Sequence, residues 1–164
     1  MFLKGYYQNG YVTHDLDRAK DIVSAACEVG DYLMFDPADL EVMTPAGPRH
    51  YLARMALAWS SGIQLELIQP LNDDTRELYR DALVADTADA SPRFHHIAIR
   101  RPTRETLEND VAATGMPLLM GGETPGFLFR YLDFRPQLGH HVEMTWATDE
   151  AWAYNQWPTD RPEI

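Results

Sequence analysis

Two stretches decide the fold of this chain: Tyr7-Gln8-Asn9-Gly10-Tyr11-Val12 near the start and Phe94-His95-His96-Ile97-Ala98-Ile99 past the middle. Each is a predicted strand, and each is followed by a predicted helix that ends in glycine. Each half then closes on an apolar strand that carries one glutamate, Ile63-Gln64-Leu65-Glu66-Leu67-Ile68 in the first and His141-Val142-Glu143-Met144 in the second. The sequence therefore predicts an α+β fold of two tandem βαβββ modules, whose curved sheets surround one pocket.

The two modules are predicted to form a single domain of 164 residues, a length that can bury most of an apolar core. The first module covers about 6–71, the second about 94–146, and a tail follows at 147–164. The first module is the longer, and its excess is assigned to an irregular, proline-bearing stretch at 36–49. The glycine-rich stretch 121–126 is predicted to be a turn or a flexible loop.

The two helices have recognisable ends. The first is expected at about 15–29, with Asp15 as its N-cap, because an aspartate side chain can accept a hydrogen bond from a free amide of the first turn. Gly30 stands where a helix commonly ends. The second helix is expected at about 103–114 and is closed by Gly115.

Composition limits the function. The net charge of −11 repels phosphate backbones, so nucleic acid is not an expected partner. No segment approaches the ~20 apolar residues needed to cross a bilayer. The single cysteine, Cys27, excludes an internal disulfide and is predicted to be a small core residue. Together these features favour a cytoplasmic protein that acts on a small molecule.

Four polar side chains occupy matching places in the two modules: Gln8, Glu66, His96 and Glu143. Strand side chains alternate between faces, so a curled sheet could bring these four together. An imidazole, two carboxylates and an amide oxygen suit Zn²⁺, Ni²⁺, Co²⁺, Mn²⁺ or Fe²⁺. Taken singly, such residues are more often ordinary surface or core groups. The adjacent pair His140-His141 could compete as ligands, and it is placed either directly behind the ligands or at the rim of the site.

The sequence resembles the vicinal oxygen chelate superfamily, which includes glyoxalase I, methylmalonyl-CoA epimerase, extradiol dioxygenases and bleomycin-resistance proteins. The resemblance covers about residues 6–146 and rests on Gly10 to Ala19, Leu65 to Leu71, His95 to Ala98 and Val142-Glu143. The stretch Gln64 to Asp74 looks most like methylmalonyl-CoA epimerase. Epimerases usually place histidine where this chain has Gln8, and a Gln, Glu, His, Glu set resembles animal-type glyoxalase I.

The resemblance implies a divalent metal ion held by Gln8, Glu66, His96 and Glu143. It implies an isomerase, epimerase or lyase that moves a proton beside the carbonyl of a small hydroxy-carbonyl or acyl-thioester substrate. Glu143 is the first choice of base, and Glu66 is the second.

Two other functions stay open. An extradiol-type dioxygenase would need Fe²⁺ held by two histidines and a carboxylate, which Gln8 disfavours. A non-catalytic binding protein of the resistance type would enclose its ligand between aromatic walls, and the chain has 18 aromatic residues, Trp59, Trp146, Trp152 and Trp157 among them.

Partners are expected to be a small-molecule substrate and a second copy of the chain. Arg54, Arg93 and Arg130 are candidate contacts for an anionic substrate group, although each could equally be a surface ion-pair partner. Trp152 to Trp157 forms an apolar tail that needs covering, and this favours a homodimer.

Overall fold

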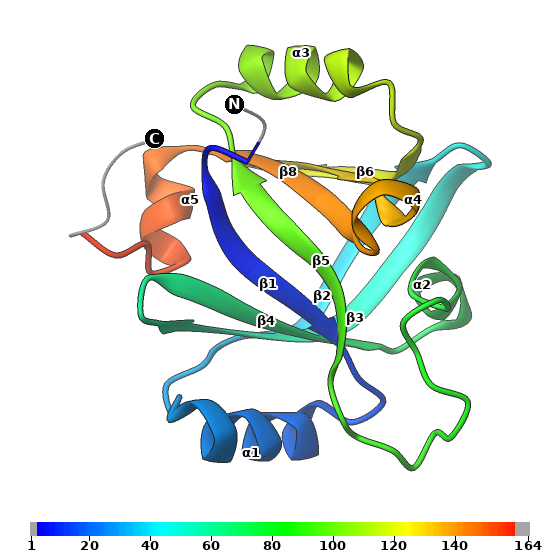
Figure 1. Ribbon diagram of the computed structural model, residues 1–164, viewed down its shortest axis with the longest axis vertical. Coiled ribbons are helices and arrows are strands. Elements are labelled where there is room, and N and C mark those ends of the chain that lie inside the picture. The colour runs from blue at the N-terminus through cyan, green and yellow to red at the C-terminus, as the bar shows by residue number, and fades with distance from the viewer. Residues whose placement is uncertain (1–2, 160–164) are drawn as a thin grey trace.

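The computed structural model describes residues 3–159 and consists of a closed β-barrel with helices around it (Figure 1). The strands follow one another around the barrel in the order β1-β4-β3-β2-β6-β7-β8-β5. Their bounds are β1 (Tyr6–Val12), β2 (Leu33–Thr44), β3 (Gly47–Ser60), β4 (Ile63–Pro70), β5 (Arg93–Arg100), β6 (Leu118–Thr124), β7 (Phe127–Leu132) and β8 (His141–Ala147). The helices are α1 (Leu16–Cys27), α2 (Asp73–Leu78), α3 (Arg104–Thr114), α4 (Arg135–Leu138) and α5 (Asp149–Tyr154).

The barrel is built from two equivalent halves. β1 pairs in parallel with β4, and β5 pairs in parallel with β8. The halves meet at one seam where β1 and β5 run antiparallel, and at a second seam where β2 pairs with β6. Each module therefore supplies four strands, which confirms the predicted α+β fold of two repeated units around one pocket.

The two longer helices lie on opposite outer sides of the barrel (Figure 1). α1 buries Leu16 and Ala19 against Ala56 and Leu67 of the first module. In the same way, Leu107 of α3 packs against Leu128, Leu132 and Met144 of the second module. This leaves the inside of the barrel free for a cavity. None of the helices in residues 3–159 combines the length and the apolar character needed to span a membrane.

The helix ends confirm most of the predicted signals. The Asp15 side chain accepts a hydrogen bond from the amide of Arg18, and Gly115 closes α3 with a φ of 63°. The predicted end of the first helix at Gly30 is wrong, because Glu28 already adopts the left-handed conformation with a φ of 54°. The prediction for Cys27 is also wrong, since this residue is exposed on the last turn of α1.

The two stretches predicted as irregular are strands. Residues 36–49 belong to the β2–β3 hairpin, whose pairing continues from Leu33↔Leu57 to Thr44↔Gly47. Of its three prolines, Pro37 lies at the register shift after Phe35 and Pro45 lies in the turn, while Pro48 is the second residue of β3 and is paired with Met43. Residues 118–124 form β6, and only the two residues that follow make the turn into β7.

The tryptophans of the C-terminal segment pack against the barrel of the same chain. Trp152 is 4% exposed and packs edge-on against Tyr7, and Trp157 contacts Tyr7, Trp59 and Trp152. The tail therefore folds onto its own barrel, and the reason that the sequence offered for a dimer no longer applies. The last part of the predicted tail, 160–164, lies outside the described residues.

The homodimer stays a prediction without that support. Light scattering of the purified protein at working concentration measures its mass directly, and a dimer is expected at twice the chain mass of 18.7 kDa. A single species at the chain mass would contradict the prediction.

Candidate metal centre

Three of the four predicted ligands converge inside the barrel. Nε2 of His96 lies 3.3 Å from Oε2 of Glu66 and 3.4 Å from Oε2 of Glu143. His96 is fully buried, and the two glutamates are 4% and 6% exposed. They come from β5, β4 and β8, so both modules contribute.

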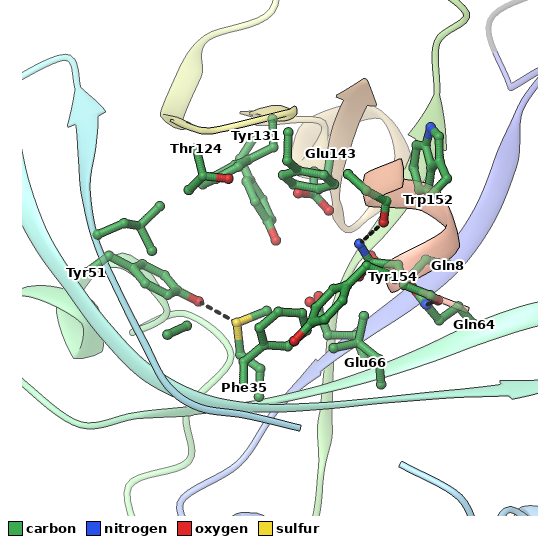
Figure 2. Close-up of a pocket in the computed structure, with 18 of the residues that line it drawn as sticks. Gln8, Phe35, Tyr51, Gln64, Glu66, Thr124, Tyr131, Glu143, Trp152 and Tyr154 are labelled. Atoms are coloured by element: carbon green, nitrogen blue, oxygen red, sulfur yellow. Dashed lines mark hydrogen bonds between the residues drawn. The ribbon is translucent and has the colours of Figure 1, made fainter. Parts of the chain in front are cut away.

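The fourth predicted ligand, Gln8 on β1, lines the same cavity as the two glutamates (Figure 2). Its strand lies between β4 and β5, and Gly10, two residues along, is paired with both Glu66 and His96. The Gln8 amide nitrogen donates to Oε1 of Gln64 at 2.8 Å, which orients the side chain. The four residues thus lie on four adjacent strands.

Gly10 makes room for the histidine. A Cβ atom at this position would lie 1.8 Å from Cε1 of His96, closer than any two such atoms can approach. The imidazole ring of His96 therefore lies directly across the β1 backbone, and only glycine allows this close approach.

A bulge at His95 places two neighbouring histidines together. Gly10 is paired with His96 and Tyr11 with Phe94, so His95 has no partner on β1. An extra residue in one strand interrupts the alternation of faces. As a result both imidazole rings lie against the ring of Tyr131, at centroid distances of 6.0 Å for His95 and 4.8 Å for His96.

Tyr131 is a site residue that the sequence analysis missed. Its hydroxyl lies 3.2 Å from Nε2 of His96, and its side chain lines the cavity beside Glu143 (Figure 2). Burial, reinforced by the charge of Glu143, raises the pKa of Tyr131 well above its usual value. The hydroxyl therefore keeps its proton and can act as a hydrogen-bond donor. On the sequence alone this residue looks like any aromatic of an apolar strand.

A second polar cluster lies beside the first and comprises Asp81, His95 and His141. Nε2 of His141 lies 2.7 Å from Oδ2 of Asp81, and Nδ1 of His95 lies 3.1 Å from Nδ1 of His96. Neither member of the pair His140-His141 joins the group of Glu66, His96 and Glu143. His141 is 2% exposed and contacts the exposed carboxylate of Asp81, so it lies behind the ligand group rather than at the rim, which is one of the two places that the sequence suggested.

Burial and charge oppose each other at His96. Burial lowers the pKa of this imidazole, but the nearby carboxylates of Glu143 and Glu66 outweigh burial and raise it to about 9. Burial raises the pKa of the Glu143 carboxyl. Without a metal ion, a protonated His96 is the cation that sits between the two acids.

The donor set fits a divalent ion. Oε1 of Gln8 and Oε2 of Glu66 are buried and have no hydrogen-bond partner among residues 3–159. Glu66 Oε2 approaches His96 closely, yet the geometry makes no hydrogen bond. Buried acceptors without donors are costly unless a cation satisfies them. One amide oxygen, two carboxylates and one imidazole nitrogen form a ligand set of the kind that borderline divalent metals prefer.

Metal affinity is expected to depend on pH, because an ion that binds through Nε2 of His96 must displace the proton held there up to about pH 9. Affinity should rise about tenfold per pH unit up to about pH 9, then level off. The stability of the metal-free protein changes with pH in the opposite direction. The raised pKa of His96 contributes its full stabilisation below about pH 6.5, and this contribution is lost as the pH rises to about 9. Chelator competition and thermal unfolding between pH 6 and 10 measure both. An affinity that is constant over this range would contradict the prediction.

The cavity next to these residues has a volume of about 310 Å³. Gln8, Gln64, Glu66 and Glu143 lie at one end, and aromatic side chains form much of the remaining wall (Figure 2). The aromatic residues are Tyr7, Phe35, Tyr51, Tyr79, Phe127, Phe129, Tyr131, Trp152 and Tyr154.

The three arginines predicted as anion contacts are engaged elsewhere. Arg54 pairs with Asp17 at 3.0 Å. Arg93 pairs with Asp89 at 2.8 Å, and Arg130 pairs with Glu108 at 2.6 Å. None of these arginines lines the cavity. They are ordinary ion-pair partners, which was the other interpretation of the sequence.

No family model and no curated protein matches the chain. Solved structures do match. A hypothetical protein from Bacillus halodurans C-125 superposes with a TM-score of 0.60 at 15% identity, over 88% of this chain and 94% of that one. Methylmalonyl-CoA epimerase from Mycobacterium tuberculosis superposes with a TM-score of 0.57 at 16% identity, over 91% of each chain.

A variant of Streptomyces coelicolor methylmalonyl-CoA epimerase, in complex with 2-nitronate-propionyl-CoA, superposes with a TM-score of 0.58 at 16% identity. It matches over 90% of this chain and 96% of that one. At these identities the likeness concerns the fold alone. The chain therefore has the fold of these epimerases, as the two repeated strand patterns indicated.

Proposed function

We propose that the protein is a metal-dependent isomerase, epimerase or lyase that moves a proton at the carbon beside a carbonyl group. The observation that carries this proposal is the convergence of two buried carboxylates on His96 Nε2, at 3.3 and 3.4 Å, at the end of a cavity. Gln8, Glu66, His96 and Glu143 would hold the ion. When bound, a divalent ion supplies Lewis acidity, which makes the proton beside a carbonyl easier to remove.

The chain itself supplies the base and a donor. Glu143 lines the cavity, and burial raises the pKa of its carboxyl, so it accepts a carbon-bound proton more readily than an exposed carboxylate does. The same carboxyl can return the proton to the neighbouring carbon, which completes an isomerisation, or release it to solvent before the carbon is reprotonated. Tyr131 donates a hydrogen bond to a substrate oxygen where negative charge develops. Glu66 is the second candidate base.

The cavity lining favours an uncharged hydroxy-carbonyl compound over an acyl-thioester on a phosphate-bearing carrier. Among residues 3–159, the charged side chains that line it are Glu66 and Glu143, whose charges a divalent ion would neutralise, and aromatic rings form much of the remaining wall. A volume of about 310 Å³ is at the small end for ligand sites. Binding of neutral aryl hydroxy-ketones, hemithioacetals and acyl-CoAs to the metal-loaded protein ranks these classes, and a clear preference for acyl-CoA would contradict this part of the proposal.

A ligand-sequestering protein is the second candidate, because the aromatic wall would also suit one. Retained metal together with exchange of a substrate α-proton in D₂O supports the enzyme, whereas tight binding without turnover supports sequestration. Oxygen consumption with a catechol would indicate the dioxygenase instead.

Protein purified without chelator is expected to retain about one divalent ion per chain. His96→Ala and Glu143→Ala should remove this ion, because each deletes a donor of the buried set. Elemental analysis measures the metal content, and far-UV circular dichroism checks that the fold persists. An ion retained in both variants, or full activity of wild-type protein without metal, would end the proposal.

A further inference from the structure

The buried pair His95 and His96 lies at the join between the metal centre and the second polar cluster. Nδ1 of His95 lies 3.1 Å from Nδ1 of His96. Only one proton can lie between two ring nitrogens at this distance, so one imidazole donates and the other accepts. This choice decides which ring nitrogen each histidine offers to its other neighbours.

The surroundings of His96 decide which of the two histidines is the donor. Its Nε2 faces Glu66, Glu143 and Tyr131, so this is the nitrogen that would bind an ion. A neutral imidazole that binds a metal through Nε2 carries its proton on Nδ1. His96 Nδ1 is therefore the donor and His95 Nδ1 the acceptor, and the proton of neutral His95 lies on its own Nε2.

The far side of His95 points to a carboxylate. Its Nε2 lies 3.9 Å from Oδ1 of Asp81 and has no hydrogen-bond partner among residues 3–159. Asp81 follows α2, and its other carboxylate oxygen accepts hydrogen bonds at 2.7 Å from His141 Nε2 and from Arg135 Nη1. A small movement of either side chain would let the Asp81 carboxylate accept a hydrogen bond from Nε2–H of His95.

We propose that His95 and Asp81 are positioning residues for the metal ligand His96, joined to it as Asp81–His95–His96. Residues behind a metal-bound histidine fix its tautomer and ring orientation. The usual arrangement has a carboxylate or carbonyl directly behind the ligand, whereas here a second imidazole lies between them. This inference rests on the proposed metal centre.

The same proton assignment argues against a second metal ion at Asp81, His95 and His141. An ion at His95 Nε2 would require the His95 proton on Nδ1, where it would face the His96 proton 3.1 Å away. Arg135, which binds Asp81, adds a positive charge to the same place. The cluster therefore supports the first centre and does not form another.

The decisive experiment compares metal affinity in three variants, using Zn²⁺ and a chromophoric chelator. His95→Leu keeps the volume and removes the acceptor, and it is expected to weaken affinity about 10- to 100-fold. His95→Asn retains an oxygen near the Nδ1 position and is expected to recover most of the loss. Asp133→Asn is the matched control, because Asp133 contacts Arg135 and lies 3.6 Å from His141 but is outside the series.

Nitrogen-15 spectra of histidine-labelled protein test the assignment without any activity measurement. His95 is expected as the Nε2–H tautomer, and His96 as Nδ1–H in the zinc-loaded protein. Unchanged affinity in His95→Leu, an Nδ1–H tautomer at His95, or two ions per chain would overturn the inference while leaving the proposed function intact. A wild-type protein that binds no ion would overturn both.

Discussion

Replacing Glu143 with glutamine is expected to reduce exchange of a substrate α-proton in D₂O by about a hundred- to ten-thousand-fold. The amide keeps the size of the side chain and an oxygen that can face the ion, but it cannot accept a proton from carbon. The buried carboxyl of Glu143 lines the cavity, and burial raises its pKa, so it is the stronger candidate base. Proton NMR of substrate in D₂O measures the exchange directly.

Glu66→Gln is the matched control for this prediction. Glu66 lies at nearly the same distance from His96 Nε2 as Glu143 does, 3.3 against 3.4 Å, and is also buried. Both variants should weaken metal binding by a similar factor, so exchange is compared at saturating metal. If Glu66→Gln loses exchange and Glu143→Gln keeps it, the two glutamates have the reverse roles.

The second large effect is expected from Gly10→Ala, the smallest side-chain addition possible. The new methyl group would lie 1.8 Å from Cε1 and 2.4 Å from Nε2 of His96, so the ring must leave its place or the strand must move. Overpacking of this kind costs about 1–3 kcal/mol or more. We expect a loss of unfolding free energy at the upper end of that range and loss of the bound ion, measured by urea unfolding and elemental analysis.

Gly30→Ala provides the comparison. Apart from residues 29–31 themselves, no heavy atom of the described chain lies within 4 Å of a Cβ at position 30, so this variant should change stability by less than about 0.5 kcal/mol and retain its metal. A Gly10→Ala protein with wild-type stability and metal content would mean that His96 does not occupy the place described.

The sequence was sufficient to predict the repeat and the strands that carry the four polar side chains. Gln8 and His96 lie on the equivalent strands β1 and β5, which are neighbours in the closed barrel, and Glu66 and Glu143 lie on β4 and β8, which flank that pair. The contact between the two modules at β1 and β5 is therefore enough to bring the four strands side by side.

What the sequence could not predict depends on partner strands. The bulge that brings His95 beside His96 is defined only by the pairing with β1. Asp81 reaches the site from a loop, and nothing in its local sequence distinguishes it from other acidic residues. The β2–β3 hairpin looked irregular because its prolines disfavour a strand locally, while the partner strand and a register shift accommodate them.

The seam between β1 and β5 makes the two halves dependent on each other. Gln8 and Glu66 belong to the first half, and His96 and Glu143 belong to the second. Each copy of the repeated unit therefore contains two of the four proposed metal ligands. An ion at the seam would act as a non-covalent cross-link between the copies. Under the proposed function, the loss of the two donors of either copy would therefore remove the metal site from both.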